Sequence, residues 1–329
     1  MNDTSIAGTT RQERLFSPTL SLAGFGVLLG WHFIILYQPL PLAEGAVPSE
    51  FILTRQIALN ASLGLAFALC GRLFARLSQG EGTRSALIAG ASVVLGTAGS
   101  ITLVAGSVLD LTWIMVAVVL IGVSEAALML LWLRFYSETS ENYSGQSLGA
   151  SAVIAALICF FAHHLTFEVS AAVLVALPVL SGVLLFTATR GIPLRKNDPL
   201  GAGVPDWKSA RRPYAKVTVQ LMVMALFFGA AQGCRSSRET LLSIADPIAI
   251  LGAAVAGAVI FAMYARSRLL PNPTPAINAA TLLFLGGMML LPFPGGVTSL
   301  IASILIMTGF IFYFVLAVIF IIDLVRTFD

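Results

Sequence analysis

The sequence predicts an all-α integral membrane protein with about ten transmembrane helices. Hydrophobic residues make up 57% of the 329 residues and charged residues only 11%, whereas a soluble domain carries about 25% charged residues. So few charges cannot cover a water-facing surface of this size, and lipid is therefore expected to surround much of the chain. The chain also contains ten largely apolar stretches of the length, about 20 residues, that a helix needs to cross the hydrocarbon core.

These ten stretches are continuous apolar runs, and we expect helices because a helix satisfies its own backbone polar groups in lipid. A polar cytoplasmic tail, residues 1–18, precedes them and lacks the features of a removable signal peptide. In chain order, the predicted spans cover residues 19–38, 54–74, 85–106, 111–133, 148–167, 169–188, 216–234, 246–265, 275–293 and 297–322.

One connection between the predicted spans is long. Residues 189–215 are rich in proline, glycine and basic residues and are expected to form a cytoplasmic loop. This loop divides the chain into a first bundle of six helices, residues 19–188, and a second bundle of four helices, residues 216–329.

The lysines and arginines predict the orientation, because cytoplasmic loops carry an excess of both residues. With ten spans, only Arg55, Arg235 and Arg238 of the 19 basic residues fall on the outer side. We therefore expect a multi-pass protein of the cell membrane with both termini, Met1 and Asp329, on the cytoplasmic side.

Small residues spaced four apart predict close helix contacts in lipid. Gly26 and Gly30 have this spacing in the first span, as do Ala253 and Gly257 in the eighth. Pro178 predicts a kink in the sixth span.

Two features recur about 190 residues apart. The basic turn after the second span, Gly71-Arg72-Leu73-Phe74-Ala75-Arg76, has a counterpart after the eighth in Ala265-Arg266-Ser267-Arg268, and Gly122 in the fourth span corresponds to Gly309 in the tenth. This six-plus-four layout resembles the major facilitator superfamily, in which two six-helix halves form a parallel repeat. The resemblance implies two further helices after Asp329, so we expect the chain to be a fragment, the product of a truncated reading frame, or a true ten-helix protein.

The turn after the second span matches the superfamily's motif in part. Gly71 and Arg76 stand at the motif's spacing, so the resemblance implies that they belong to a turn that gates the cytoplasmic face. Ala75 replaces the motif's Asp, and the membrane-embedded Arg of the family's fourth helix is absent. These departures count against an active transporter.

Two further stretches resemble a different group. The fourth span runs from Gly122-Val123-Ser124-Glu125 to Leu131-Trp132-Leu133-Arg134-Phe135-Tyr136-Ser137, and the first contains Gly24-Phe25-Gly26 with Trp31 five residues on. Both are similar to segments of actinobacterial membrane-bound regulators, in which a twelve-helix facilitator-like domain precedes a LuxR-type helix-turn-helix domain. The resemblance implies a small-molecule-sensing membrane domain, without direct nucleic-acid contact from these residues.

Ionisable residues at membrane depth are expensive and usually face a cavity or a partner. Glu125 lies fourteen residues into the fourth span, and His32 lies midway through the first. Glu125 is a candidate proton-coupling carboxylate or ligand counter-charge; the structural alternative is a neutral glutamate that locks helix contacts. His32 is a candidate proton carrier, or a neutral interhelical hydrogen bonder.

Three further polar residues are candidates for ligand contact. Asn60 in the second span either contacts a ligand or holds helices together. Gln232 and Arg235 lie at the outer end of the seventh span, where an anionic ligand from outside would meet them. Alternatively, the arginine pairs with Glu239 or extends to lipid headgroups.

We expect no enzyme activity, cofactor or metal site. The sequence holds no phosphate-binding glycine loop, zinc signature or nucleophile elbow, and its three cysteines, Cys70, Cys159 and Cys234, lie far apart. Besides the bilayer, the expected partner is an unidentified small molecule. Two hypotheses follow: the sensing domain of a LuxR-type regulator, or a secondary transporter that is ion-coupled through Glu125.

Overall fold

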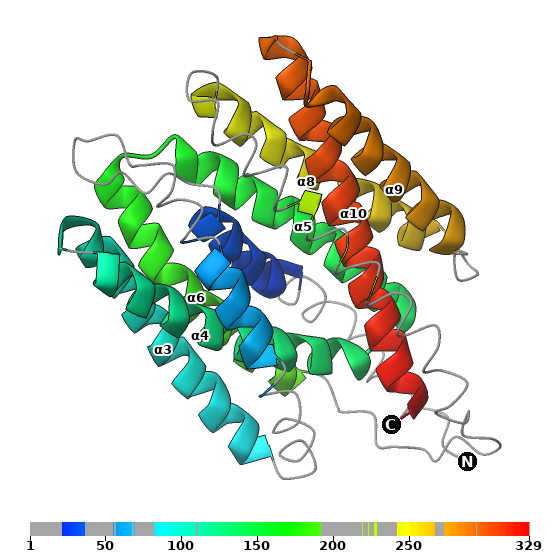
Figure 1. The fold of residues 1–329 in the computed structure, drawn as a ribbon. Coiled ribbons are helices and arrows are strands. Elements are labelled where there is room, and N and C mark those ends of the chain that lie inside the picture. The colour runs from blue at the N-terminus through cyan, green and yellow to red at the C-terminus, as the bar shows by residue number, and fades with distance from the viewer. Residues whose placement is uncertain are drawn as a thin grey trace, which may run out of the picture.

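A computed structural model describes residues 22–36, 55, 57–67, 69, 82–109, 111–191, 219, 223, 227–228, 242–266, 273–293 and 295–328. All regular structure in these residues is helical (Figure 1). The labelled helices are α3 (Gly82–Leu109), α4 (Leu111–Ser137), α5 (Glu141–His163), α6 (Phe167–Gly191), α8 (Leu242–Arg266), α9 (Pro273–Leu290) and α10 (Gly296–Phe328).

Six of these helices, all except α9, are long and apolar enough to cross a membrane. Three shorter apolar helices cover Leu22–Leu36, Ile57–Phe67 and Pro275–Leu290, within the first, second and ninth predicted spans. The prediction of an all-helical membrane protein is therefore confirmed at this level. The tail 1–18, most of the loop 189–215 and most of the seventh predicted span lie outside the described residues.

Among the described helices, the predicted boundary that is displaced most is the start of the fifth span. The fifth span was predicted at residues 148–167, but α5 runs from Glu141 to His163. The Ser140 side chain caps the helix by accepting a hydrogen bond from the Tyr143 backbone nitrogen at 3.3 Å, which satisfies one of the free N–H groups of the first turn. The polar residues after this cap belong to the helix, although in the sequence they are too polar to count as part of an apolar run.

The helices pack most extensively in three pairs: α3 with α4, α5 with α8, and α9 with α10. The α5–α8 pair is the one that joins the two predicted bundles, and α10 also packs on α8 and touches α5. Phe228, a described residue of the seventh predicted span, stacks on Phe310 of α10 with ring centroids 4.1 Å apart. Helices of the two predicted bundles thus share one core.

Glycines bring several helix backbones together. A Cβ on Gly309 of α10 would stand 2.6 Å from the Phe284 nitrogen of α9, and one on Gly149 of α5 would stand 2.6 Å from the Phe261 nitrogen of α8. Gly26 and Gly30 similarly face Ile154 and Ile158 of α5. The predicted close packing at Gly26 and Gly30 is confirmed.

Candidate functional site

The most deeply buried acidic side chain among the described residues is that of Glu125. It lies in the middle of α4, in a stretch that is otherwise apolar apart from Ser124, and its side chain is 0% exposed. A carboxylate in such a position needs a partner or a proton, because burying an unpaired charge in an apolar medium is strongly unfavourable.

The partner is His32. Its Nδ1 lies 2.5 Å from Glu125 Oε1, and its side chain is 14% exposed. Sequence reasoning predicted these two residues separately, each as a polar group at membrane depth. The structure brings them together across the interface between Leu22–Leu36 and α4.

The contact holds the two groups close without using all their capacity for hydrogen bonds. Beyond this ion-pair contact, neither oxygen of Glu125 has a hydrogen-bond partner among the described residues. A carboxylate has about four acceptor positions. The Glu125–His32 pair therefore has unused acceptor capacity for a water molecule or a ligand donor.

The pair is electrically neutral as an imidazolium with a carboxylate or as a neutral imidazole with a protonated carboxyl; either state carries one proton more than a neutral imidazole with a carboxylate. Removal of that proton leaves a negative charge in the apolar core, and addition of a second leaves a positive charge. Either charge is costly at this depth.

Both members of the pair are held in place through their sequence neighbours, which dock on one face of α3. Trp31 donates from Nε1 to Ser100 Oγ at 3.1 Å, and Ser124 donates from Oγ to the Ser92 carbonyl at 2.7 Å. Gly96 lies between these two serines, and a Cβ there would stand 2.5 Å from Ser124 Oγ and 2.9 Å from Trp31 Cη2. The three small residues lie on one face because they are spaced by four.

Ser92, Gly96 and Ser100 were not predicted as site residues. They carry no charge, and nothing in their types indicates chemistry. Their four-residue spacing in an apolar helix is the signal in the sequence that indicates a contact face. Which residues dock on that face follows from the tertiary structure alone.

Asn60 is the one further predicted site residue that the structure describes, and it is not brought to this pair. Asn60 lies on an exposed side of the helix Ile57–Phe67. On the same helix, Ser62 packs against Gly122 of α4 and donates to the Val118 carbonyl at 3.4 Å. The remaining predicted residues lie outside the described residues; they are Gln232, Arg235, Gly71 and Arg76.

The two stretches for which the sequence indicates a resemblance to membrane-bound regulators pack against each other. Gly24 touches the Trp132 ring directly, and the Phe25 ring meets that of Tyr136 edge-on at a centroid distance of 5.8 Å. Ser181 of α6 ties both stretches together: its hydroxyl accepts from Trp132 Nε1 at 3.2 Å and donates to the Gly24 carbonyl at 3.1 Å.

No group of three or more metal-ligating side chains occurs among the residues that the structure describes. No protein-family profile matches the chain, and no curated protein matches it either.

Proposed function

We propose that this chain is the sensing membrane domain of a transcriptional regulator, of the kind that precedes a LuxR-type helix-turn-helix domain. In this proposal a small molecule shifts the membrane helices between two packings, with the His32–Glu125 pair at the centre of the change. The domain adopts the ten-helix, six-plus-four arrangement of the facilitator type, in the cell membrane, with both termini in the cytoplasm.

The observation that carries this proposal is the contact between the two resembling stretches. Residues around Gly24 and Phe25 are separated from Trp132 and Tyr136 by more than 100 residues in the sequence, yet they form one aromatic packing unit. Each of the two short sequence similarities to the membrane-bound regulators is weak evidence when taken alone. Two that form one contact in the core support a shared fold of this part of the chain.

The buried His32–Glu125 pair supports a switch between two packings of the helices. A ligand shifts an equilibrium only by its differential affinity for the two states. A donor group that used the open acceptor positions of Glu125 would compete with His32 for the carboxylate. Because the residues next to both members dock on α3, a change at the pair would be passed to that helix.

A second candidate function is proton-coupled secondary transport. The observation that favours it is again the His32–Glu125 pair, since a protonatable pair at membrane depth is typical of proton relays in transporters. The replacement of the motif's Asp by Ala75 in the cytoplasmic turn counts against this candidate.

The sensor proposal is tested in the source organism with the complete coding frame that contains these residues. Sequencing past Asp329 should reveal further spans and then a helix-turn-helix domain. Deletion of the gene should change transcription of a small set of operons, and Glu125→Gln should alter the same set. Glu138→Gln is the matched control, because it makes the same chemical change at a pair with Arg134 outside the core.

The transporter candidate has a separate assay. The full-length protein is reconstituted into vesicles that contain a pH-sensitive dye, and a panel of organic acids and amines is added under an imposed proton gradient. Proton movement that depends on one of these compounds and is abolished by Glu125→Gln would establish transport. A frame that ends in a stop codon after further spans, together with an unchanged transcript profile, would overturn the sensor proposal.

A further inference from the structure

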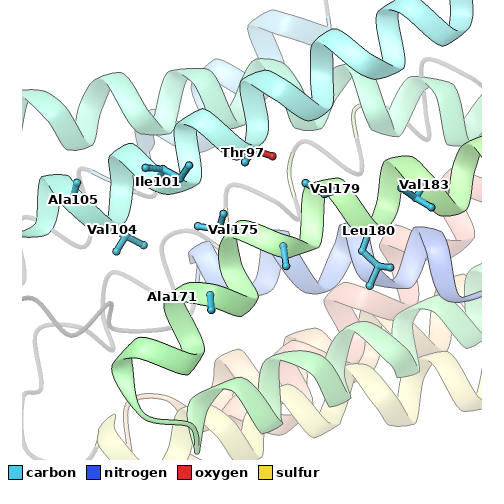
Figure 2. A pocket seen from close by; sticks show the side chains of 11 residues that line it. Thr97, Ile101, Val104, Ala105, Ala171, Val175, Val179, Leu180 and Val183 are labelled. Carbon is cyan, nitrogen blue, oxygen red and sulfur yellow. The ribbon is translucent and has the colours of Figure 1, made fainter.

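The outer surface formed by α3 and α6 contains an apolar groove of about 870 Å³. Eleven residues line it, and Figure 2 shows them along the two helices. Both helices belong to the set that can cross a membrane, so the groove lies along membrane-spanning segments. Its volume is within the range, roughly 300–1,000 Å³, of sites that hold small molecules.

The groove results from how α3 and α6 cross. Near the middle of both helices the backbones approach closely: Gly182 touches Val93, and a Cβ on Gly96 would stand 3.2 Å from Pro178 Cβ. Toward the C-terminal part of α3 and the N-terminal part of α6 the helices diverge, as Figure 2 shows for Val104 and Ala171. Pro178 interrupts the backbone hydrogen bonds of α6 between these two regions, which is a common cause of a kink.

The side chains that line the groove are apolar. Ten of the eleven lining residues are Ala, Val, Ile or Leu, and the remaining one, Thr97, has its hydroxyl oxygen buried. The alanines at 171, 172 and 176 leave space, while Ile101 and Val183 stand at the rim with 52% of their surface exposed. Such a wall offers van der Waals contact and no polar anchor.

We propose that this groove binds one acyl chain of a bilayer phospholipid. On α6 the lining residues extend from Ala171 to Val183, a rise of about 18 Å, which is close to half of the roughly 30 Å hydrocarbon core. A chain that enters from the membrane surface at which α6 begins therefore runs the length of the groove. The binding requires only that the protein lies in a bilayer and is independent of the proposed function.

A second copy of the protein fits this groove less well than a lipid chain. In lipid, helices associate through small residues that let their backbones touch and through interhelical hydrogen bonds. The glycines that serve this purpose here, such as Gly149, Gly257 and Gly309, are used between helices of the same chain. The groove contains no glycine and exposes no polar atom, and its one pair of small lining residues spaced by four is Ala172 and Ala176.

The test uses the full chain in phosphatidylcholine vesicles that contain a trace of phosphatidylcholine with a photoactivatable diazirine in one acyl chain. After illumination, labelled residues are mapped by mass spectrometry. Labelling should be concentrated at residues 97–105 and 171–183. Leu282, Leu285 and Met289 of α9 are the internal reference, because their exposure is comparable or higher and they do not line this groove.

Two variants sharpen the result. Ala172→Leu combined with Ala176→Leu fills the groove from exposed positions and should reduce its labelling to the level of the α9 reference. Ala98→Leu adds the same side chain at an exposed position of α3 outside the groove and should leave the excess unchanged. Melting temperatures close to that of the wild type establish that both proteins are folded.

Equal labelling of the groove and of the α9 reference in the wild-type protein would overturn the proposal, since it would show only transient contacts with bulk lipid. Formation of a disulfide-linked dimer by Ile101→Cys in vesicles, with little lipid labelling of the groove, would overturn it in favour of a second copy.

Discussion

The carbonyl oxygen of Gly149 in α5 lies against Gly257 in α8, closer to the position of a Cβ on residue 257 than non-bonded atoms come. The two helices therefore touch through their backbones. A Cβ on Gly257 would also stand 2.9 Å from the Cβ of Ala152, which lies on α5 as well. This seam joins helices that belong to different predicted bundles.

Gly257→Ala should destabilise the protein, because the added methyl group meets backbone atoms that cannot rotate away. Overpacking of this kind costs about 1–3 kcal/mol, and the melting temperature in detergent should fall. Gly286→Ala is the matched control, since nothing lies within 4 Å of a Cβ there; the better helix propensity of Ala should leave stability unchanged or slightly higher. Equal melting temperatures for the two variants would contradict the close contact.

The contact face on α3 provides a second comparison within one helix. A methyl group at Gly96 meets Ser124 Oγ and the Trp31 ring, whereas one at Gly90 meets open space. Gly96→Ala should therefore lower the free energy of unfolding by about 1–3 kcal/mol, and Gly90→Ala should not. If both substitutions behave alike, the neighbours of His32 and Glu125 do not dock on this face.

The buried pair predicts strong non-additivity between two substitutions. His32→Leu or Glu125→Leu alone should destabilise the protein by about 3–5 kcal/mol, because each leaves an unpaired buried group. The double variant should be near the wild type or more stable, since an apolar pair of similar volume often replaces a buried ion pair without loss. Steric trapping in bicelles measures these free energies of unfolding.

The matched control for that cycle is the pair Arg134–Glu138, which is partly exposed, with its atoms 3.3 Å apart. Exposed pairs contribute about 0–1 kcal/mol, so its leucine variants should change stability little and additively. Additive effects at His32 and Glu125 would mean that the two side chains do not interact in the folded protein.

Membrane insertion can be tested with tryptophan fluorescence. Trp113 of α4 is 51% exposed, whereas Trp31 and Trp132 are fully buried. Phospholipids brominated in the acyl chains should therefore quench mainly Trp113, and Trp113→Phe should remove most of the quenching. Trp207→Phe, in the predicted cytoplasmic loop, is the control and should leave it in place. Quenching that survives in Trp113→Phe would place α4 away from lipid.

The orientation predicted from the basic residues has its own test. A reporter that fluoresces only in the cytoplasm, fused after Asp329, should be bright in intact cells. A dark fusion present at normal amounts would reverse the predicted side of the C-terminus, and the count of ten spans would be wrong.

The positions of the helices were largely predictable because apolar length is a local property. The fourth predicted span, residues 111–133, begins where α4 begins. The start of α5 was not predicted correctly, because its first turn is polar and depends on the Ser140 cap. Glu125 and His32 were each recognisable as polar residues at membrane depth.

Their contact was not predictable, since nothing in a single sequence specifies which helices are neighbours. The same holds for the Gly149–Gly257 contact: the spacing of Ala253 and Gly257 indicated a packing face, while its partner on α5 emerged only from the structure. The groove between α3 and α6 depends on where two helices cross and diverge, and no residue type at positions 171–183 indicates it.

The seam between α5 and α8 also has a consequence for synthesis of the protein. Gly257 follows Gly149 by 108 residues, which a ribosome adds in about 5–20 s at typical elongation rates. During that interval α5 is already made, but the helix that covers its glycine face is not. The glycine face of α5 therefore lacks its α8 contact during this interval, and this part of the packing is completed only after α8 has been made.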